Sequence, residues 1–324
     1  MIEKNKLQEA ADHGIISNEQ VAPLHAFLHE DIGEDTDSET GEEQLKFVRS
    51  FGDIFITLGV VFVAVALSRF DLQGYANLIP VAAFALIAEW LVRARRLALP
   101  GIAILLAMLY FTSKLGSFET GEHGLFSVGL MTAVAAAFYL RHRMPFSLLP
   151  IAAGVIGIVT YWLGIDVSKL ALVLSGYGLA LFAVAMWFDV QDAARKTRLS
   201  DCAFWLHLLA APLIVHGVMV SLLSPGGIET PFKEILTIVF FIGFFLLALF
   251  VDRRALLVSS ISYAIYAVIE LTEGHMIRVE NITLFIFMLF GIFIIFFGTY
   301  WYKARSLIFA PLANKPVSRY VPRI

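Results

Sequence analysis

FGDIFITLGVVFVAVALSRF, residues 51–70, decides the fold class of this chain. The stretch is mainly apolar and contains only two charged residues, Asp53 and Arg69, one near each end. An α-helix of about 20 apolar residues crosses the hydrocarbon core of a bilayer, which is about 30 Å thick. We therefore expect a membrane-spanning helix at this position.

Nine more apolar stretches follow, and together the ten predict an all-α protein, a polytopic transmembrane helical bundle. Hydrophobic residues make up 59% of the 324 residues and charged residues 16%, whereas a soluble domain carries about 25% charged residues. The further spans are expected near residues 75–93, 98–114, 124–141, 145–165, 168–188, 203–223, 232–252, 254–271 and 281–302.

The boundary between the eighth and ninth spans depends on the charged triplet Asp252-Arg253-Arg254, because the sequence on both sides of it is apolar. A continuous helix over residues 232–271 would be about 60 Å long, twice the thickness of the hydrocarbon core. We therefore expect a tight turn at residues 252–254.

The distribution of basic residues predicts the orientation. Of the 24 lysines and arginines, 19 fall in segments that lie on one side of a ten-span bundle, and five fall on the other. Basic residues stay on the cytoplasmic side of bacterial membranes. We therefore expect both termini in the cytoplasm.

Four of the expected cytoplasmic turns resemble one another: RARR at 93–96, RHR at 141–143, RKTR at 195–198 and DRR at 252–254. Duplication of a two-span unit would explain the similarity. The general preference for basic cytoplasmic turns explains it equally well.

The segment before the first span is polar and divides into two parts. Residues 1–29 predict a cytoplasmic helical hairpin, with Gly14 ending the first helix and a capping box, Ser17 to Gln20, starting the second. Residues 30–46 predict a flexible acidic linker, since 30–43 contain eight acidic residues and no basic one. The remaining predicted divisions are a ten-span domain over 47–305 and a basic cytoplasmic tail over 306–324.

Polar residues inside the spans are the candidates for a functional site, because each is costly in lipid unless it is satisfied within the bundle. The ninth span places Ser259, Tyr263, Tyr266 and Glu270 on one helical face, at steps of four, three and four residues. This stripe predicts either a solvated transport path, with Glu270 as a cation or proton site, or a seam between helices.

His207 and His216 of the seventh span are secondary candidates for a transport path. They are nine residues apart, which corresponds to about 900° of helical rotation, so we expect them on opposite faces. Pro212 lies between them and predicts a kink. Because the two imidazoles cannot share one metal ion, we expect no resident metal or cofactor.

Charged residues near the span ends predict structural contacts. Glu89 precedes Arg93 by one helical turn and predicts an ion pair. Asp189 and Asp192 predict a structural charge network with the basic loop that follows them. Ser200, just before Asp201, is expected to cap the start of the seventh span.

Several function classes lack their sequence features. The net charge of −3 argues against binding of nucleic acid. No P-loop, GxSxG elbow, HExxH motif or dinucleotide-binding fingerprint occurs in the sequence, so neither nucleotide-driven pumping nor a familiar hydrolase is expected.

Three stretches carry a resemblance to a known group. Residues 9–20 (EAADHGIISNEQ), 50–59 (SFGDIFITLG) and 200–216 (SDCAFWLHLLAAPLIVH) resemble a broad group of uncharacterised bacterial multi-pass inner-membrane proteins, a domain of unknown function. The resemblance implies a location in the bacterial inner membrane. It implies no catalytic residues.

Two functions remain open from the sequence. The first is an ATP-independent permease or channel-like carrier for a small solute or ion, which uses the polar residues of the seventh and ninth spans. The second is a membrane-embedded scaffold or sensor that recruits a cytoplasmic protein through residues 4–29. Apart from these and the lipid bilayer, the sequence predicts no partner.

Overall fold

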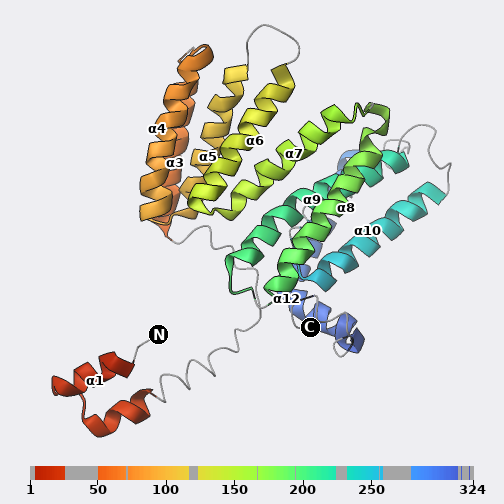
Figure 1. Cartoon of the computed structure of the whole chain (residues 1–324). Coiled ribbons are helices and arrows are strands. Elements are labelled where there is room, and N and C mark those ends of the chain that lie inside the picture. The colour runs from red at the N-terminus through yellow and green to blue at the C-terminus, as the bar shows by residue number, and fades with distance from the viewer. Residues whose placement is uncertain are drawn as a thin grey trace. The chain divides into compact units, whose positions relative to one another are not determined.

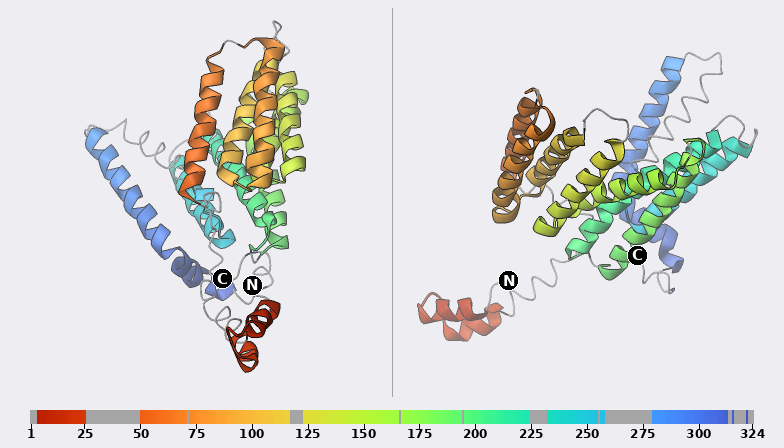
Figure 2. Two further views of the ribbon diagram at one scale, coloured as in Figure 1. Left: turned by 90° about the vertical axis from the view of Figure 1, so that its left-hand side faces the viewer. Right: turned by 45° about the horizontal axis from the view of Figure 1, so that its top comes forward.

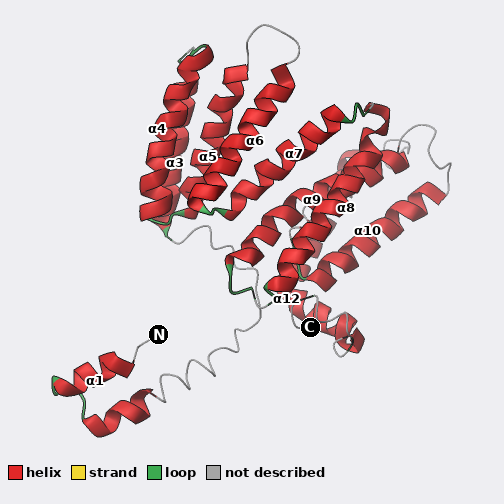
Figure 3. Ribbon diagram, in the orientation of Figure 1, coloured by secondary structure: helices red, strands yellow, loops and turns green. Residues whose placement is uncertain are grey.

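The structure is a computed structural model of the chain and describes residues 4–25, 50–70, 72–116, 123–165, 167–193, 195–223, 232–254, 256–257, 279–312, 315 and 321. Over these residues the protein is helical and contains no strand, which confirms the expected all-α class (Figure 3). The chain divides into two compact units, Met1–Gln44 and Leu45–Ile324. They are described separately.

The first unit contains a helical hairpin. Helix α1 covers Lys4–Asp12, and residues 18–25 form a second helix. Gly14 has a φ of 70° and its N–H donates to the Ala11 carbonyl, while the N–H of Ile15 donates to the Ala10 carbonyl. This pair of bonds is the Schellman arrangement, so Gly14 ends the helix as predicted.

The second helix of the hairpin begins at the predicted cap. The backbone N–H of Ser17 donates to the Gln20 side chain at 2.9 Å, which is one half of a capping box. Leu7 and Val21, one on each helix, are buried, whereas Ile15 is 76% exposed. The apolar side chains of the hairpin are therefore only partly covered within the described part of this unit.

The second unit consists of helices that follow the predicted spans closely. Its main elements are α3 (Phe51–Ser68), η2 (Gly74–Asn77), α4 (Leu78–Ala88), η3 (Glu89–Ala94), α5 (Ala98–Ser113), α6 (His123–His142), η5 (Pro145–Ser147), α7 (Leu148–Trp162), α8 (Val167–Gln191), α9 (Arg198–Leu223), α10 (Phe232–Val251) and α12 (Val279–Phe309). The predicted span near 254–271 lies outside the described residues except for 254, 256 and 257.

Six of the described helical segments are long and apolar enough to cross a membrane. Helix α5 and the Val239–Val251 part of α10 are apolar but shorter. Large apolar side chains on these helices are widely exposed, as expected where lipid replaces water as the surrounding solvent. These are features of a helical membrane protein. The full count of ten spans and their orientation remain predictions. The six segments are Phe51–Ser68, Gly74–Ala94, Gly124–His142, Pro145–Trp162, Leu170–Gln191 and Arg198–Ser221.

The turn predicted at residues 252–254 is confirmed. Helix α10 ends at Val251, and Asp252 adopts the left-handed conformation with a φ of 57°. The N–H of Arg253 then donates to the carbonyl of Ala248 at 3.0 Å, which closes the end of the helix. A continuous helix over residues 232–271 is therefore excluded.

The four turns that resemble one another in sequence also share a backbone conformation. Arg96, Arg143, Arg195 and Asp252 each have a φ between 52° and 57°, and they are the non-glycine residues with positive φ in the described part of the chain. Each follows an even-numbered helix, α4 with η3, α6, α8 or α10. The similarity of the turns therefore extends from sequence to conformation.

The helices of the second unit form two sets of four with the same pattern of neighbours. In the first set α5 packs against α3, α4 and α6, and in the second α9 packs against α7, α8 and α10 (Figures 1 and 2). The main apolar clusters follow this division: one gathers around α5 and the other around α9. In each set the third helix along the chain, α5 or α9, therefore packs against the other three.

Glycines allow α8 and α9 to pack with their backbones in contact. A methyl group at Gly178 of α8 would lie 2.8 Å from the backbone nitrogen of Ile214 in α9. A methyl group at Gly217 of α9 would lie 2.8 Å from the backbone nitrogen of Ser175 in α8. Small residues at such positions bring membrane helices close together, and here they fix the antiparallel pair that carries the site described next.

Candidate functional site

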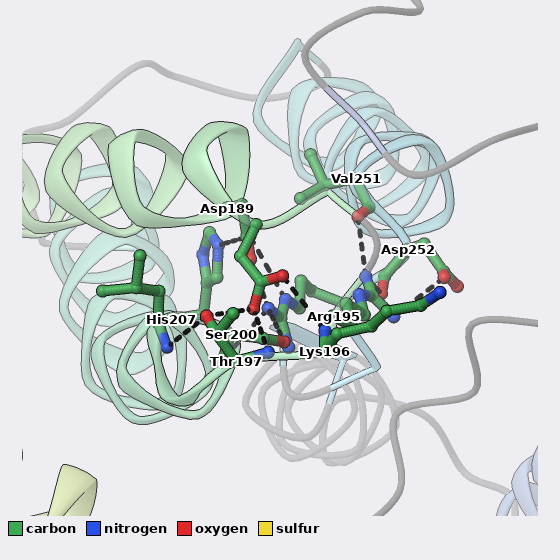
Figure 4. Close-up of polar contacts among 11 residues, drawn as sticks. Asp189, Arg195, Lys196, Thr197, Ser200, His207, Val251 and Asp252 are labelled. Atoms are coloured by element: carbon green, nitrogen blue, oxygen red, sulfur yellow. Dashed lines mark hydrogen bonds and ion pairs between the residues drawn. The ribbon is translucent and has the colours of Figure 1, made fainter. Parts of the chain in front are cut away.

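A buried acid and a buried histidine meet between α8 and α9. Asp189 lies in the last turn of α8, and His207 lies about two and a half turns into α9. The Nε2 atom of His207 is 2.9 Å from Oδ2 of Asp189 (Figure 4). Asp189 is 4% exposed and His207 is fully buried, so the pair is shielded from both water and lipid.

An arginine from a distant turn completes this cluster. Arg253 follows α10, and its Nε atom donates to Oδ2 of Asp189 at 3.2 Å while its Nη2 atom donates to Oδ1. The same Nη2 atom lies 3.1 Å from both the carbonyl oxygen and the hydroxyl of Ser200 in α9. Asp189 therefore receives two bonds from one guanidinium, which is the strongest geometry for an arginine and a carboxylate.

A second buried cluster lies beside the first, around Asp252. Its carboxylate accepts a bond from Nη1 of Arg195 at 3.0 Å and another from the indole nitrogen of Trp301 at 2.6 Å. Arg195 also donates to the backbone carbonyl of Asp252 at 2.6 Å, and Arg305 donates to the carbonyl of Leu249 at 3.1 Å. The turn after α10 is therefore tied to the turn after α8 and to α12.

The turn between α8 and α9 is organised by Asp192. Its carboxylate accepts bonds from the Thr197 backbone N–H at 2.8 Å, the Thr197 hydroxyl at 2.7 Å and the Lys196 N–H at 3.0 Å. Burial raises the pKa of Asp192, but the bonds from Thr197 and Lys196 outweigh it and hold the pKa below its ordinary value. The carboxyl is therefore charged at neutral pH.

The expected capping role of Ser200 is wrong. Helix α9 begins at Arg198, two residues earlier than Ser200, and the Thr197 hydroxyl accepts the N–H of Leu199 at 3.2 Å. Threonine is a good N-cap residue, and Asp192 holds Thr197 in place. Ser200 is instead directed at Arg253.

The structure separates the two histidines. His207 is buried in the Asp189 cluster, whereas His216 is exposed on α9. The expectation of opposite faces is therefore confirmed. Pro212 lies inside α9, which continues to Leu223. The ninth-span residues Ser259, Tyr263, Tyr266 and Glu270 lie outside the described residues.

The sequence indicated part of the charge network but missed its centre. Asp192 does bind the loop that follows it, as expected. Asp189 instead binds His207 and Arg253, which is 64 residues away in the chain. A partial signal existed, since an acid at the end of one apolar stretch and an arginine at the end of another must each find a partner in lipid.

The first set of helices contains a counterpart of this arrangement. Glu89 forms the predicted ion pair with Arg93 at 3.3 Å. It also accepts two bonds from Arg141 at the end of α6, at 2.7 and 2.9 Å. Both sets therefore join an acid on their second helix to an arginine at or just after the end of their fourth helix.

An acid, a histidine and an arginine in mutual contact are residue types that occur in proton pathways of membrane proteins. Histidine is the side chain whose ordinary pKa, about 6.5, lies nearest to neutral pH.

Among the residues that the structure describes, no group of three or more His, Cys, Asp or Glu side chains could hold a metal ion. No protein-family model, curated protein or solved structure matches the chain. The chemistry of the Asp189, His207 and Arg253 cluster is therefore the main functional evidence.

Proposed function

We propose that this chain is an ATP-independent carrier for a small solute or ion in the bacterial inner membrane, and that a proton bound at His207 is coupled to solute movement. The observation that carries the proposal is the hydrogen bond between buried His207 and buried Asp189 within a pair of membrane-spanning helices. Ionisable residues inside membrane helices are costly, and they mark ion or proton pathways in many membrane proteins.

Arg253, the third residue of the cluster, supports reversible protonation of His207. When His207 is protonated, its positive charge lies against the Asp189 carboxylate. When His207 is neutral, Arg253 still holds the same carboxylate through two bonds. Asp189 is therefore never left as an isolated buried charge, which would cost several kcal/mol.

The repeated arrangement of helices also supports a carrier. Many transporters consist of two repeats related by an axis along the membrane normal. The two four-helix sets share their packing pattern, their turn conformation and their acid–arginine pairs. The first set meets the second through contacts of α6 with α7 and of η5 with α9.

Proton movement into proteoliposomes tests the proposal. The full chain is reconstituted with a pH-sensitive dye inside, and gradients of carboxylates, amino acids, inorganic phosphate and metal cations are applied in turn. At least one gradient should drive proton movement. His207→Gln should reduce the rate at least tenfold, because glutamine cannot exchange a proton.

His216 was the other histidine predicted for the path, but it is exposed on α9 and lies outside the Asp189 cluster. His216→Gln is therefore the matched control and should retain the rate. Equal loss in both variants, or full activity of His207→Gln, would refute the role of His207.

Glu270 of the ninth span belongs to the same proposal, and Glu270→Gln should abolish solute-dependent flux while the protein still inserts.

A second function is supported by the separate compactness of the N-terminal unit. Met1–Gln44 forms a unit of its own, and Ile15 on its surface is 76% exposed. This arrangement suits a module that recruits a cytoplasmic protein. Deletion of residues 1–45 separates the two functions: a carrier keeps its flux, whereas a scaffold or sensor loses its co-purifying partner.

A further inference from the structure

The turns after η3 and after α6 together present an arginine-rich surface. The bonds between Glu89 and Arg141 join the two turns, although the residues are 52 positions apart. The surface contains five arginines, all exposed, and one half-buried acid. We define this surface, the arginine surface, as Glu89, Arg93, Arg95, Arg96, Arg141 and Arg143.

Two features hold Arg141 and Arg95 in a fixed arrangement. Glu89 accepts Nε and Nη2 of Arg141, so the Nη1 group of this exposed side chain takes part in neither bond. The guanidinium of Arg95 lies 5.4 Å from the centre of the Trp90 ring. A preorganised guanidinium loses less conformational entropy when it binds an anion than a free one does.

The surface borders an apolar face of the same helices. Trp90 is 59% exposed, and Leu86, one turn earlier on α4, and Leu140, next to Arg141 on α6, are also exposed. Tryptophan is enriched at the level of lipid headgroups. A ligand that fits both parts has an anionic head and apolar chains.

We propose that the arginine surface binds the headgroup phosphate of an anionic phospholipid, with the acyl chains against the exposed apolar residues of α4 and α6. Excess positive charge favours an anionic lipid over a zwitterionic one, since five arginines face one glutamate. Guanidinium groups suit phosphate because they donate two parallel hydrogen bonds. The proposal requires membrane insertion and does not require transport.

Lipid titration of the purified full chain in detergent tests this proposal. The thermal unfolding midpoint is measured against short-chain phosphatidylglycerol, short-chain phosphatidylcholine and inorganic phosphate. Phosphatidylglycerol should raise the midpoint at concentrations where the other two have no effect. A response to inorganic phosphate of equal size would show a site for free anions and overturn the assignment to lipid.

A pair of charge-matched variants locates the site. Arg95→Gln with Arg143→Gln removes one arginine from each turn and leaves the bonds of Glu89 intact. Each arginine near a lipid surface changes affinity roughly fivefold, so this variant should bind phosphatidylglycerol more than tenfold more weakly. Arg69→Gln with Lys114→Gln removes the same charge from other loops and should bind normally. Equal weakening of both variants, or of neither, would overturn the proposal. That outcome would not count against the proposed transport function, because the proton flux through His207 is measured separately.

Discussion

His207 and Arg253 share one carboxylate, and each depends on it in a different way. Arg253 needs Asp189 because a guanidinium stays charged and is 1% exposed at this position. His207 can be neutral, so its need for Asp189 varies with its proton. At the scale of single residues, Arg253 therefore stabilises the cluster and His207 makes it able to change state.

Loss of Arg253 should destabilise the protein strongly. Arg253→Gln leaves Asp189 buried without its guanidinium, and breaking a buried ion pair in this way costs about 3–5 kcal/mol. The unfolding midpoint in detergent should fall accordingly. Arg254→Gln, at the next position, removes the same charge from a partly exposed residue and should cost less than about 1 kcal/mol.

The combined variant Asp189→Asn with Arg253→Gln provides the test of coupling. Because both charges are removed together, it should be more stable than Arg253→Gln alone. Strictly additive losses from the two substitutions would show that the two side chains do not stabilise each other.

The contribution of Asp192 should depend on pH. Its folded pKa lies below the value in the unfolded chain, so its stabilisation is complete above the unfolded pKa, about 3.9, and is lost as pH falls through the folded pKa. Asp192→Asn should therefore cost about 2 kcal/mol at pH 7. The difference from the parent protein should shrink below about pH 4. A difference that persists unchanged to pH 2.5 would contradict the assignment of charged hydrogen bonds to Asp192.

The sequence predicts the residue-scale contacts that are local and misses those that are not. Glu89 with Arg93 could be foreseen because residues four apart lie on the same side of a helix. Asp189 with Arg253 could not, because the order of hairpins along the chain does not say which turn approaches which helix. Thr197 rather than Ser200 caps α9 because Asp192 holds Thr197 in place. A capping pattern read from the residues next to the helix start does not include Asp192.

The helices themselves are the part of the structure that the sequence predicts best. Their length is fixed by the thickness of the bilayer, and within it their backbone hydrogen bonds must be satisfied internally. Helix ends differ from the predicted spans by several residues, most clearly for α12, which ends at Phe309 where the sequence predicted 302, and for α9, which begins at Arg198 where the sequence predicted 203. Charged residues continue a helix beyond the apolar core, so hydropathy alone places helix ends poorly.

Helix α8 offers a controlled test of close packing. Gly178→Ala places a methyl group 2.8 Å from the Ile214 nitrogen and must push α9 away, which should cost about 1–3 kcal/mol. Gly176→Ala, one half-turn away, meets no atom within 4 Å and should leave stability unchanged or slightly raised. Unfolding midpoints of the two variants provide the measurement. Equal midpoints would contradict the glycine-mediated contact of α8 and α9.

The second unit has one division that hydropathy does not reveal. From the similarity of the basic turns, the sequence offered a duplicated two-span unit as one of two explanations. Packing instead groups the helices in fours, with α5 and α9 as the equivalent central members. The sequences of α5 and α9 are no more apolar than those of the other spans, because lipid and the protein interior require similar side chains. The central, buried position of these two helices could therefore not be predicted from hydropathy.

Orientation of the second unit remains a prediction that a fusion can test. A fluorescent reporter fused after Ile324 should be active in the cytoplasm, and alkaline phosphatase at the same position should be inactive. Fusion after Gly116, in an expected outer loop, should give the reverse pattern. Phosphatase activity after Ile324 would contradict the assignment of both termini to the cytoplasm and would invert every loop.

Proton binding by the purified protein tests the central claim most directly. The full chain in weakly buffered detergent is mixed with the solute that drives proton movement in proteoliposomes, and the change in pH is recorded. Coupling at His207 predicts the exchange of about one proton per chain in the parent protein and in His216→Gln, and none in His207→Gln. The same proton exchange in His207→Gln would contradict the claim that the Asp189–His207 pair carries the proton.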